Sequence, residues 1–178
     1  MKNVLIISSS PRKNGNSDIL CDRFAEGARE SGNTVEKIFL ASKNIGYCTG
    51  CGVCNDTHKC VQDDDMKEII EKMLKADVIV FATPVYFYSM NGRMKNFIDR
   101  TVPRYTDMSN KEFYFIMTSA DTEKSNLNRT LEAFRGFTED CLEGAKESGI
   151  IYGTGAWQIG EIKNTPAYNE AYEMGKAI

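Results

Sequence analysis

The sequence predicts an α/β protein built on a doubly wound, five-stranded parallel sheet in three layers. Apolar runs of strand length alternate along the chain with segments whose apolar residues recur at helical spacing. The runs over 4–7 and 113–117 are aliphatic or aromatic throughout, which is typical of strands buried on both faces of a parallel sheet. Five strands that alternate with five helices place helices on both sides of the sheet.

The first strand, over 4–7, is followed by a polar turn and a helix. Asn16 or Ser17 can cap that helix, because a side-chain oxygen at this position accepts a hydrogen bond from a free backbone N–H. Apolar residues then recur at helical spacing until Gly32, which is expected to end the helix. A second strand is predicted over 34–40.

The middle of the chain repeats this order after an irregular stretch. Asp63 or Asp64 can cap a helix whose inward side carries methionine, isoleucine and leucine residues. A third strand follows over 77–83, and Asn91 can cap a shorter helix.

The last third of the chain supplies two strands and two helices. A mostly apolar fourth strand is predicted over 112–118. Helical spacing then runs from Leu127 to Gly149 and leads to the fifth strand, within 150–160. A helix over 165–178 closes the chain.

The composition fits a single domain over 1–178 and gives no electrostatic preference. The chain has 22 basic and 25 acidic residues and a formal net charge of -3, so neither nucleic acid nor an anionic membrane is expected as a partner. Its apolar runs have strand length and its start shows no signal-peptide pattern. We therefore expect a soluble cytoplasmic protein.

A hydroxyl-rich turn lies between the first predicted strand and helix. It reads Ser-Ser-Ser-Pro-Arg-Lys-Asn-Gly-Asn-Ser over 8–17. Backbone amides, hydroxyls and the helix dipole can all point at one anion here. The turn lacks both GxxxxGK[ST] and GxGxxG, so it favours a monophosphate over a nucleoside triphosphate or a dinucleotide. A plain polar turn with a helix cap is the alternative.

Two further segments follow predicted strands at the same edge of the sheet, where doubly wound sheets bind their ligands. The segment 83–90 is aromatic and too apolar for a purely solvated turn, so it is expected to wall an aromatic ring. The segment 118–121 offers small side chains and backbone amides to the edge of such a ring, with an ordinary Asx turn as the alternative. Together the three segments indicate a monophosphate attached to a flat ring.

Four of the six cysteines lie within a stretch of about 41–62 that shows no periodicity. Their spacing is CxxCxxCx5C, and Gly50 and Gly52 permit the tight turn that brings such thiolates together. This spacing suits a [4Fe-4S] cluster; a four-cysteine zinc site and thiols without a ligand are the alternatives. Cys21 and Cys141 fall on helical patterns and are expected in the core. The four candidate metal ligands are Cys48, Cys51, Cys54 and Cys60.

The turn over 10–17, the segments 83–87 and 95–100, and the cysteine cluster occur together in this chain. In combination they resemble the flavodoxin-like NADPH-dependent FMN reductase family and, within it, the iron-sulfur flavoproteins, over nearly the whole length. The resemblance implies a flavodoxin-like fold, FMN, NAD(P)H as cosubstrate and a homodimer or larger assembly. The residues it implies for the FMN phosphate are Ser10, Arg12, Asn16 and Ser17. Those it implies for the isoalloxazine ring are Pro84, Val85, Tyr86, Phe87, Tyr88, Ser119, Ala120 and Asp121.

The function expected from these features is that of an FMN-dependent oxidoreductase. Reduced nicotinamide would pass hydride to FMN, and electrons would continue to a small-molecule or protein acceptor, directly or through a [4Fe-4S] cluster. Because the cofactor carries the chemistry, no side chain is predicted to be catalytic. The alternative is a non-enzymatic electron carrier between protein partners. Since GxSxG, HExxH and Cx5R motifs are absent, a hydrolase is not expected.

Overall fold

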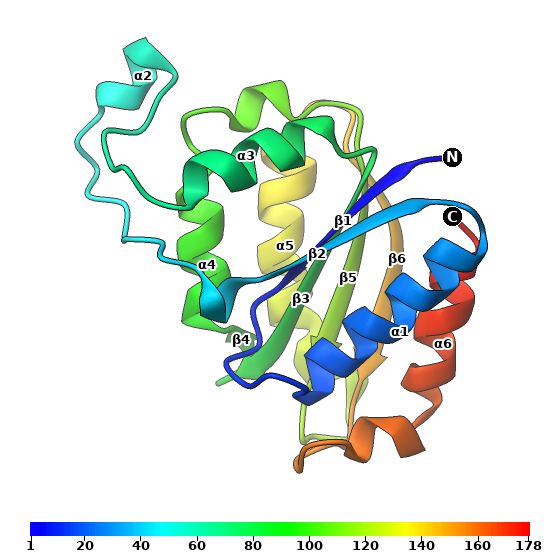
Figure 1. Ribbon diagram of the computed structural model, residues 1–178. Helices are drawn as coiled ribbons and strands as arrows, with labels where there is room; N and C mark the ends of the chain where they lie inside the picture. Colours follow the sequence, from blue (N-terminus) through cyan, green and yellow to red (C-terminus); the bar gives the residue numbers. More distant parts are fainter.

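The sheet has five parallel strands in the order β2-β1-β3-β5-β6 (Figure 1). The computed structural model describes residues 1–178. The strand order reverses at β1, as in a doubly wound sheet, so the predicted fold class is confirmed. A short strand, β4, pairs antiparallel with the end of β3. The strands are β1 (Asn3–Ser8), β2 (Thr34–Phe39), β3 (Val78–Tyr86), β4 (Ser89–Met90), β5 (Glu112–Thr118) and β6 (Lys146–Gly153).

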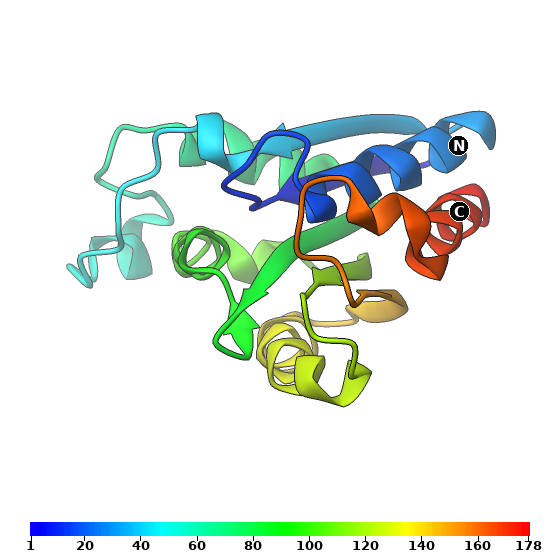
Figure 2. The same ribbon diagram turned by 90° about the horizontal axis from the view of Figure 1, so that it is seen from below.

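Helices cover both faces of the sheet, and the two-residue period of the strands divides the core in two (Figures 1 and 2). Val4 and Ile6 face α1 and α6, whereas Leu5 and Ile7 belong to the core under α3, α4 and α5. None of the helices combines the length and the apolar character needed to cross a membrane. The main helices are α1 (Asn16–Glu30), α3 (Met66–Lys75), α4 (Gly92–Asp99), α5 (Asn128–Cys141) and α6 (Pro166–Lys176). The short helical pieces are η1 (Leu40–Ser42), α2 (Val53–Thr57), η2 (Tyr105–Asp107), η3 (Lys124–Leu127) and η4 (Glu161–Asn164).

Two glycines allow α1 and α6 to pack with their backbones in contact. A Cβ atom at Gly27 would lie 2.1 Å from the carbonyl oxygen of Tyr172, and one at Gly175 would lie 2.1 Å from that of Phe24. No real Cβ contact is this short. The second half of α1 is therefore packed directly against α6.

The helix predicted from Leu127 to Gly149 is too long. Helix α5 ends at Cys141, and β6 begins at Lys146, well before the predicted strand. The chain turns at Gly144, whose φ of 67° is in the left-handed region that favours glycine. Apolar residues in this turn pack against the core and so continue the helical spacing by coincidence. Cys141, predicted in the core, is exposed, whereas Cys21 is fully buried as predicted, and burial raises the pKa of its thiol.

The aromatic segment predicted as a loop is instead the end of a strand and a tight hairpin. Strand β3 continues beyond the predicted end at Thr83 to Tyr86. It then pairs with β4 across a two-residue turn formed by Phe87 and Tyr88, both with positive φ (49° and 63°). Positive φ at both central residues suits the twist of a hairpin but costs energy in bulky residues. The turn therefore fixes where Phe87 and Tyr88 leave the backbone, while the Phe87 side chain itself is fully exposed.

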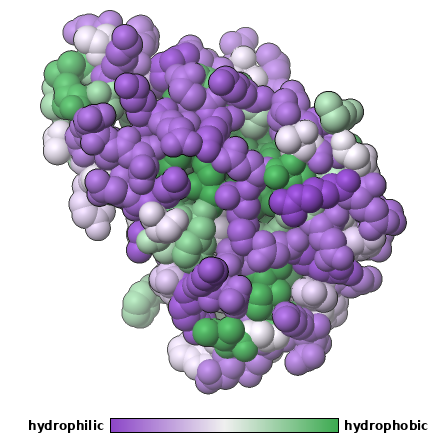
Figure 3. All heavy atoms as spheres, viewed as in Figure 1, coloured by the Kyte–Doolittle hydropathy of each residue, from purple (hydrophilic) through white to green (hydrophobic).

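The cysteine-containing segment projects from one corner of the molecule in both ribbon views (Figures 1 and 2). Apart from the single-turn helix α2 it is irregular, as its lack of periodicity predicted. On the face seen in Figure 3, hydrophilic residues dominate and hydrophobic ones form small, separate patches.

Candidate functional site

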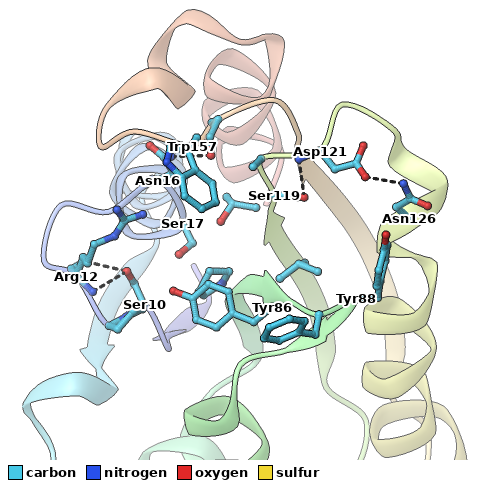
Figure 4. A pocket seen from close by; sticks show the side chains of 17 residues that line it. Ser10, Arg12, Asn16, Ser17, Tyr86, Tyr88, Ser119, Asp121, Asn126 and Trp157 are labelled. Carbon is cyan, nitrogen blue, oxygen red and sulfur yellow. Dashed lines mark hydrogen bonds between the residues drawn. The ribbon is translucent and has the colours of Figure 1, made fainter.

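A pocket of about 560 Å³ opens at the carboxyl ends of β1, β3 and β5 (Figure 4). Its volume is in the range of about 300–1,000 Å³ that is usual for small-molecule sites. All twelve residues predicted to contact FMN line it, although they come from three separate segments. The remaining lining residues are Pro11, Thr118, Asn126, Ala156 and Trp157.

One end of the pocket is the polar turn between β1 and α1. Ser10 closes the turn on itself, since its Oγ donates to the carbonyl of Arg12 (2.8 Å) and accepts from the N–H of Arg12 (3.2 Å). The N-cap is Gly15, which has no side chain to satisfy the first N–H groups of α1. These groups are therefore available to an anion, together with the Ser17 hydroxyl and the Arg12 guanidinium.

Asn16 has a different place from the one predicted. It is the first helical residue, so the prediction that Asn16 or its neighbour caps α1 is wrong. Its Nδ2 donates to the carbonyls of Ala156 (3.1 Å) and Gln158 (3.0 Å), and its Oδ1 accepts from Gly160 N–H (3.0 Å). Both side-chain donors are thus used within the protein. The Asn16 amide ties the loop after β6 to the turn, which leaves only its backbone to meet an anion.

Asp18 stabilises the turn between β1 and α1 through hydrogen bonds to two of its residues. Its buried carboxylate accepts from Ser8 Oγ (3.0 Å) and from the N–H of Asn14 (3.0 Å), at either end of the turn, and pairs with Lys37 Nζ (3.0 Å). Burial alone would lower the pKa of Lys37, but hydrogen bonds to Asp22 and Asp18 outweigh it and raise the pKa. The lysine is therefore charged and balances the buried carboxylate. Asp18 also lies in the first turn of α1, where a carboxylate interacts favourably with the helix dipole.

The hairpin forms the aromatic wall of the pocket. Figure 4 shows Tyr86 and Tyr88 reaching from it toward the pocket, with the polar turn on the other side. Asn91 connects the two walls, because its Nδ2 donates to the carbonyl of Ser9 (2.7 Å) while its Oδ1 caps α4 through Met94 N–H (3.0 Å), as predicted. The turn and the hairpin are therefore held at a fixed separation.

The third wall, after β5, is an Asx turn that also lines the pocket. Asp121 accepts from the N–H of Glu123 (2.9 Å) and from Nδ2 of Asn126 (2.6 Å), and these bonds lower the pKa of its carboxyl. Ser119 Oγ accepts from the N–H of Asp121 (3.0 Å). The Asx turn given as the alternative is therefore present, and its residues also line the pocket.

Trp157 lies at the mouth of the pocket and was missed from the sequence (Figure 4). It is 70% exposed, and its backbone N–H donates to Glu161 Oε2 (2.7 Å). The sequence predicts the fifth strand only as lying within 150–160, which leaves its end undefined. Had β6 been ended at Gly153, the same strand-end rule that found the other walls would have indicated Trp157.

The four predicted metal ligands, Cys48, Cys51, Cys54 and Cys60, line a second, smaller hollow of about 260 Å³. Gly50 and Gly52 have positive φ (64° and 75°), as expected for the turn between the first three cysteines. No three cysteine, histidine or acidic side chains lie close enough together to hold a metal ion. His58, at the end of α2, is exposed. The structure thus gathers the thiols around one hollow without closing them on a common centre.

The two arms of the cysteine segment are joined where they leave the body of the protein. Asp64 accepts from the N–H groups of Gly46 (3.0 Å) and Met66 (3.1 Å), and pairs with the Arg100 guanidinium (2.7 Å). Burial alone would raise the pKa of Asp64, but these donors outweigh it and hold the pKa below its usual value. The prediction that Asp63 or Asp64 is the N-cap of α3 is wrong by one residue, because the helix begins at Met66 and its N-cap is Asp65. Asp64 instead closes the neck of the segment.

Comparison with known proteins decides the family. The family model described as NADPH-dependent FMN reductase matches residues 2–134. The chain belongs to this family. Its flavodoxin-like fold is shared with an NAD(P)H:quinone oxidoreductase from Methanothermobacter marburgensis, at a TM-score of 0.75 and 16% identity over 98% of this chain and 96% of that one.

Curated relatives of this FMN reductase family member include iron-sulfur flavoproteins. The chain is 44% identical over 97 residues to one from Archaeoglobus fulgidus, a match that covers 54% of this chain and 44% of the relative. It is 32% identical over 130 residues, 68% of each chain, to a Bacillus subtilis protein whose name places it among NAD(P)H-dependent FMN-containing oxidoreductases. The chain spans about half the length of the iron-sulfur flavoproteins that it matches.

Proposed function

We propose that this chain is an oxidoreductase that binds FMN in the pocket at the strand ends and takes electrons from NADH or NADPH. One observation carries the proposal: three segments far apart in the sequence form one pocket with an anion-binding turn at one end and an aromatic hairpin at the other. A pocket with an anion-binding end and an aromatic end matches a ligand in which a phosphate is attached to a flat ring. Membership in the FMN reductase family supports the same ligand.

In this proposal the protein residues bind and orient. Arg12, Ser17 and the first N–H groups of α1 hold the phosphate, and Ser10 keeps the turn closed. The hairpin at Tyr86 and the loop of Trp157 exclude water from the ring. FMN, when bound, supplies hydride acceptance and electron transfer, so no side chain has to act as an acid, base or nucleophile.

We further propose that the four cysteines hold a [4Fe-4S] cluster that passes electrons toward the acceptor. The donor set fits, since four thiolates are the usual ligands of such clusters and all four cysteines line one hollow. Glycines with positive φ between the first three cysteines let their side chains turn toward one side. The iron-sulfur flavoproteins among the relatives favour this over a zinc site or empty thiols.

Anaerobic stopped-flow mixing tests the enzymatic function. We expect NADH or NADPH to bleach the oxidised flavin of the FMN-loaded protein, at a rate that rises with nucleotide concentration and exceeds that of free FMN. The reason is that binding converts hydride transfer between two solutes into a reaction of oriented partners. A flavin that dithionite reduces but neither nucleotide reduces would contradict the proposal and favour the non-enzymatic electron carrier.

A further inference from the structure

Arg100 is a fully buried cation at the wall of the cysteine hollow. It follows the last turn of α4 and leaves 2% of its surface exposed. Burying a charged side chain costs desolvation free energy unless the charge is paired, so the partners of Arg100 show what the buried cation does. The sequence indicated none of these partners, because Arg100 is 40 residues away from the nearest of the four cysteines along the chain.

The guanidinium is shared between the neck of the cysteine segment and a cysteine sulfur. Arg100 Nη1 donates to the carbonyl of Gly46 (2.7 Å), to Gln62 Oε1 (3.2 Å) and to Asp64 Oδ2 (2.7 Å). Its Nη2 donates to Asp64 Oδ1 (3.0 Å) and to the sulfur of Cys60 (3.5 Å). The two bonds to Asp64 form the planar fork that only arginine provides.

Arg100 makes more contacts than are needed to join the two arms of the cysteine segment. Asp64 and Gly46 already join the two arms, and Asp64 also binds backbone N–H groups on its own. The remaining Nη2 hydrogen points to Cys60, and the buried Nε has no partner in the protein. The other charged residue at the hollow, Asp99, is half-buried and paired with Lys95 (2.5 Å). Arg100 is therefore the positive group that faces the sulfur ligands.

We infer that Arg100 is a positioning residue that orients Cys60 toward the hollow and, through its charge, favours the reduced form of the group held there. This inference rests on the proposed cluster. Reduction adds negative charge at the sulfurs, and a buried donor aimed at one of them stabilises that charge. Hydrogen bonds to sulfur and local charge are the levers by which proteins set iron-sulfur potentials.

The test compares the midpoint potential of the cluster in matched variants, by anaerobic redox titration followed by electron paramagnetic resonance. Because Arg100→Gln alone leaves Asp64 buried without its partner, the pair is removed together in Arg100→Gln/Asp64→Asn. Arg100→Lys keeps the charge. Arg93→Gln removes an exposed cation from the same helix that does not line the hollow, as a control. Iron, sulfide and FMN per chain are measured for each protein.

In the double variant we expect the equilibrium constant for reduction of the cluster to fall about tenfold. For a one-electron couple this lowers the midpoint potential by about 59 mV. The potential of Arg100→Lys should lie between those of the double variant and the wild type, and the potential of Arg93→Gln should match the wild type. A cluster whose potential is the same in the double variant and the wild type would overturn the inference alone. Wild-type protein that takes up no iron under anaerobic reconstitution would refute the proposed cluster and this inference with it.

Discussion

Replacing Arg12 and Ser17 together by alanine is expected to weaken FMN binding about a hundredfold, since each removes a donor to a charged group and about 1.4 kcal/mol corresponds to a factor of ten. Ser17 is buried at the start of α1, so the lost hydroxyl is not replaced by bulk water. Arg12 is more exposed, and its contribution is correspondingly screened. Titration of the apoprotein with FMN, followed by quenching of flavin fluorescence, measures the effect.

Lys13→Ala is the matched control for this variant. Lys13 is an exposed cation next to Arg12 but does not line the pocket, so FMN affinity should stay within about twofold of wild type, the change that screened surface charge produces. Equal FMN affinity in the Arg12/Ser17 double variant and the wild type, with unchanged circular dichroism, would show that the phosphate is not bound in this turn.

Cys51→Ser is expected to abolish the bound iron and sulfide while FMN content stays at the wild-type level. A [4Fe-4S] cluster is held by four thiolates, so iron should fall from about four per chain to less than about one. FMN should be retained because the pocket and the cysteine hollow share no lining residue. Iron, acid-labile sulfide and flavin are assayed after anaerobic purification.

Cys141→Ser provides the comparison, because this exposed cysteine lies outside the hollow formed by the other four. Its iron content should equal that of the wild type. If Cys51→Ser kept its iron, or lost FMN along with it, the assignment of the cluster to a hollow independent of the flavin pocket would be wrong.

Most of the fold could be predicted because parallel strands buried on both faces leave an unmistakable apolar run. The strand over 112–118 was predicted with its observed bounds for this reason. The helix over 127–149 failed because apolar residues in a turn kept the helical spacing, and only the left-handed conformation at Gly144 marks where the chain reverses. The spacing of apolar residues indicates which positions are buried. It does not distinguish a helix from a turn whose side chains pack against the core.

The walls of the candidate site could be predicted, but the contacts that hold them in place could not. Turn residues and strand ends are local features, and the rule that ligands bind at one edge of the sheet brings them together. The bond from Asn16 to the loop of Trp157, and that from Arg100 to Cys60, join segments that are distant in sequence. Nothing in the local pattern of either residue indicates its partner, so only the folded chain reveals these roles.

In the proposed function, the pocket at the strand ends binds FMN through the phosphate as well as through the ring. Titration of the wild-type apoprotein with FMN and with riboflavin, which has the same ring and no phosphate, tests this most directly. We expect FMN to bind at least about a hundredfold more tightly, since the turn supplies several donors to a dianion. Equal affinity for the two flavins would contradict the account.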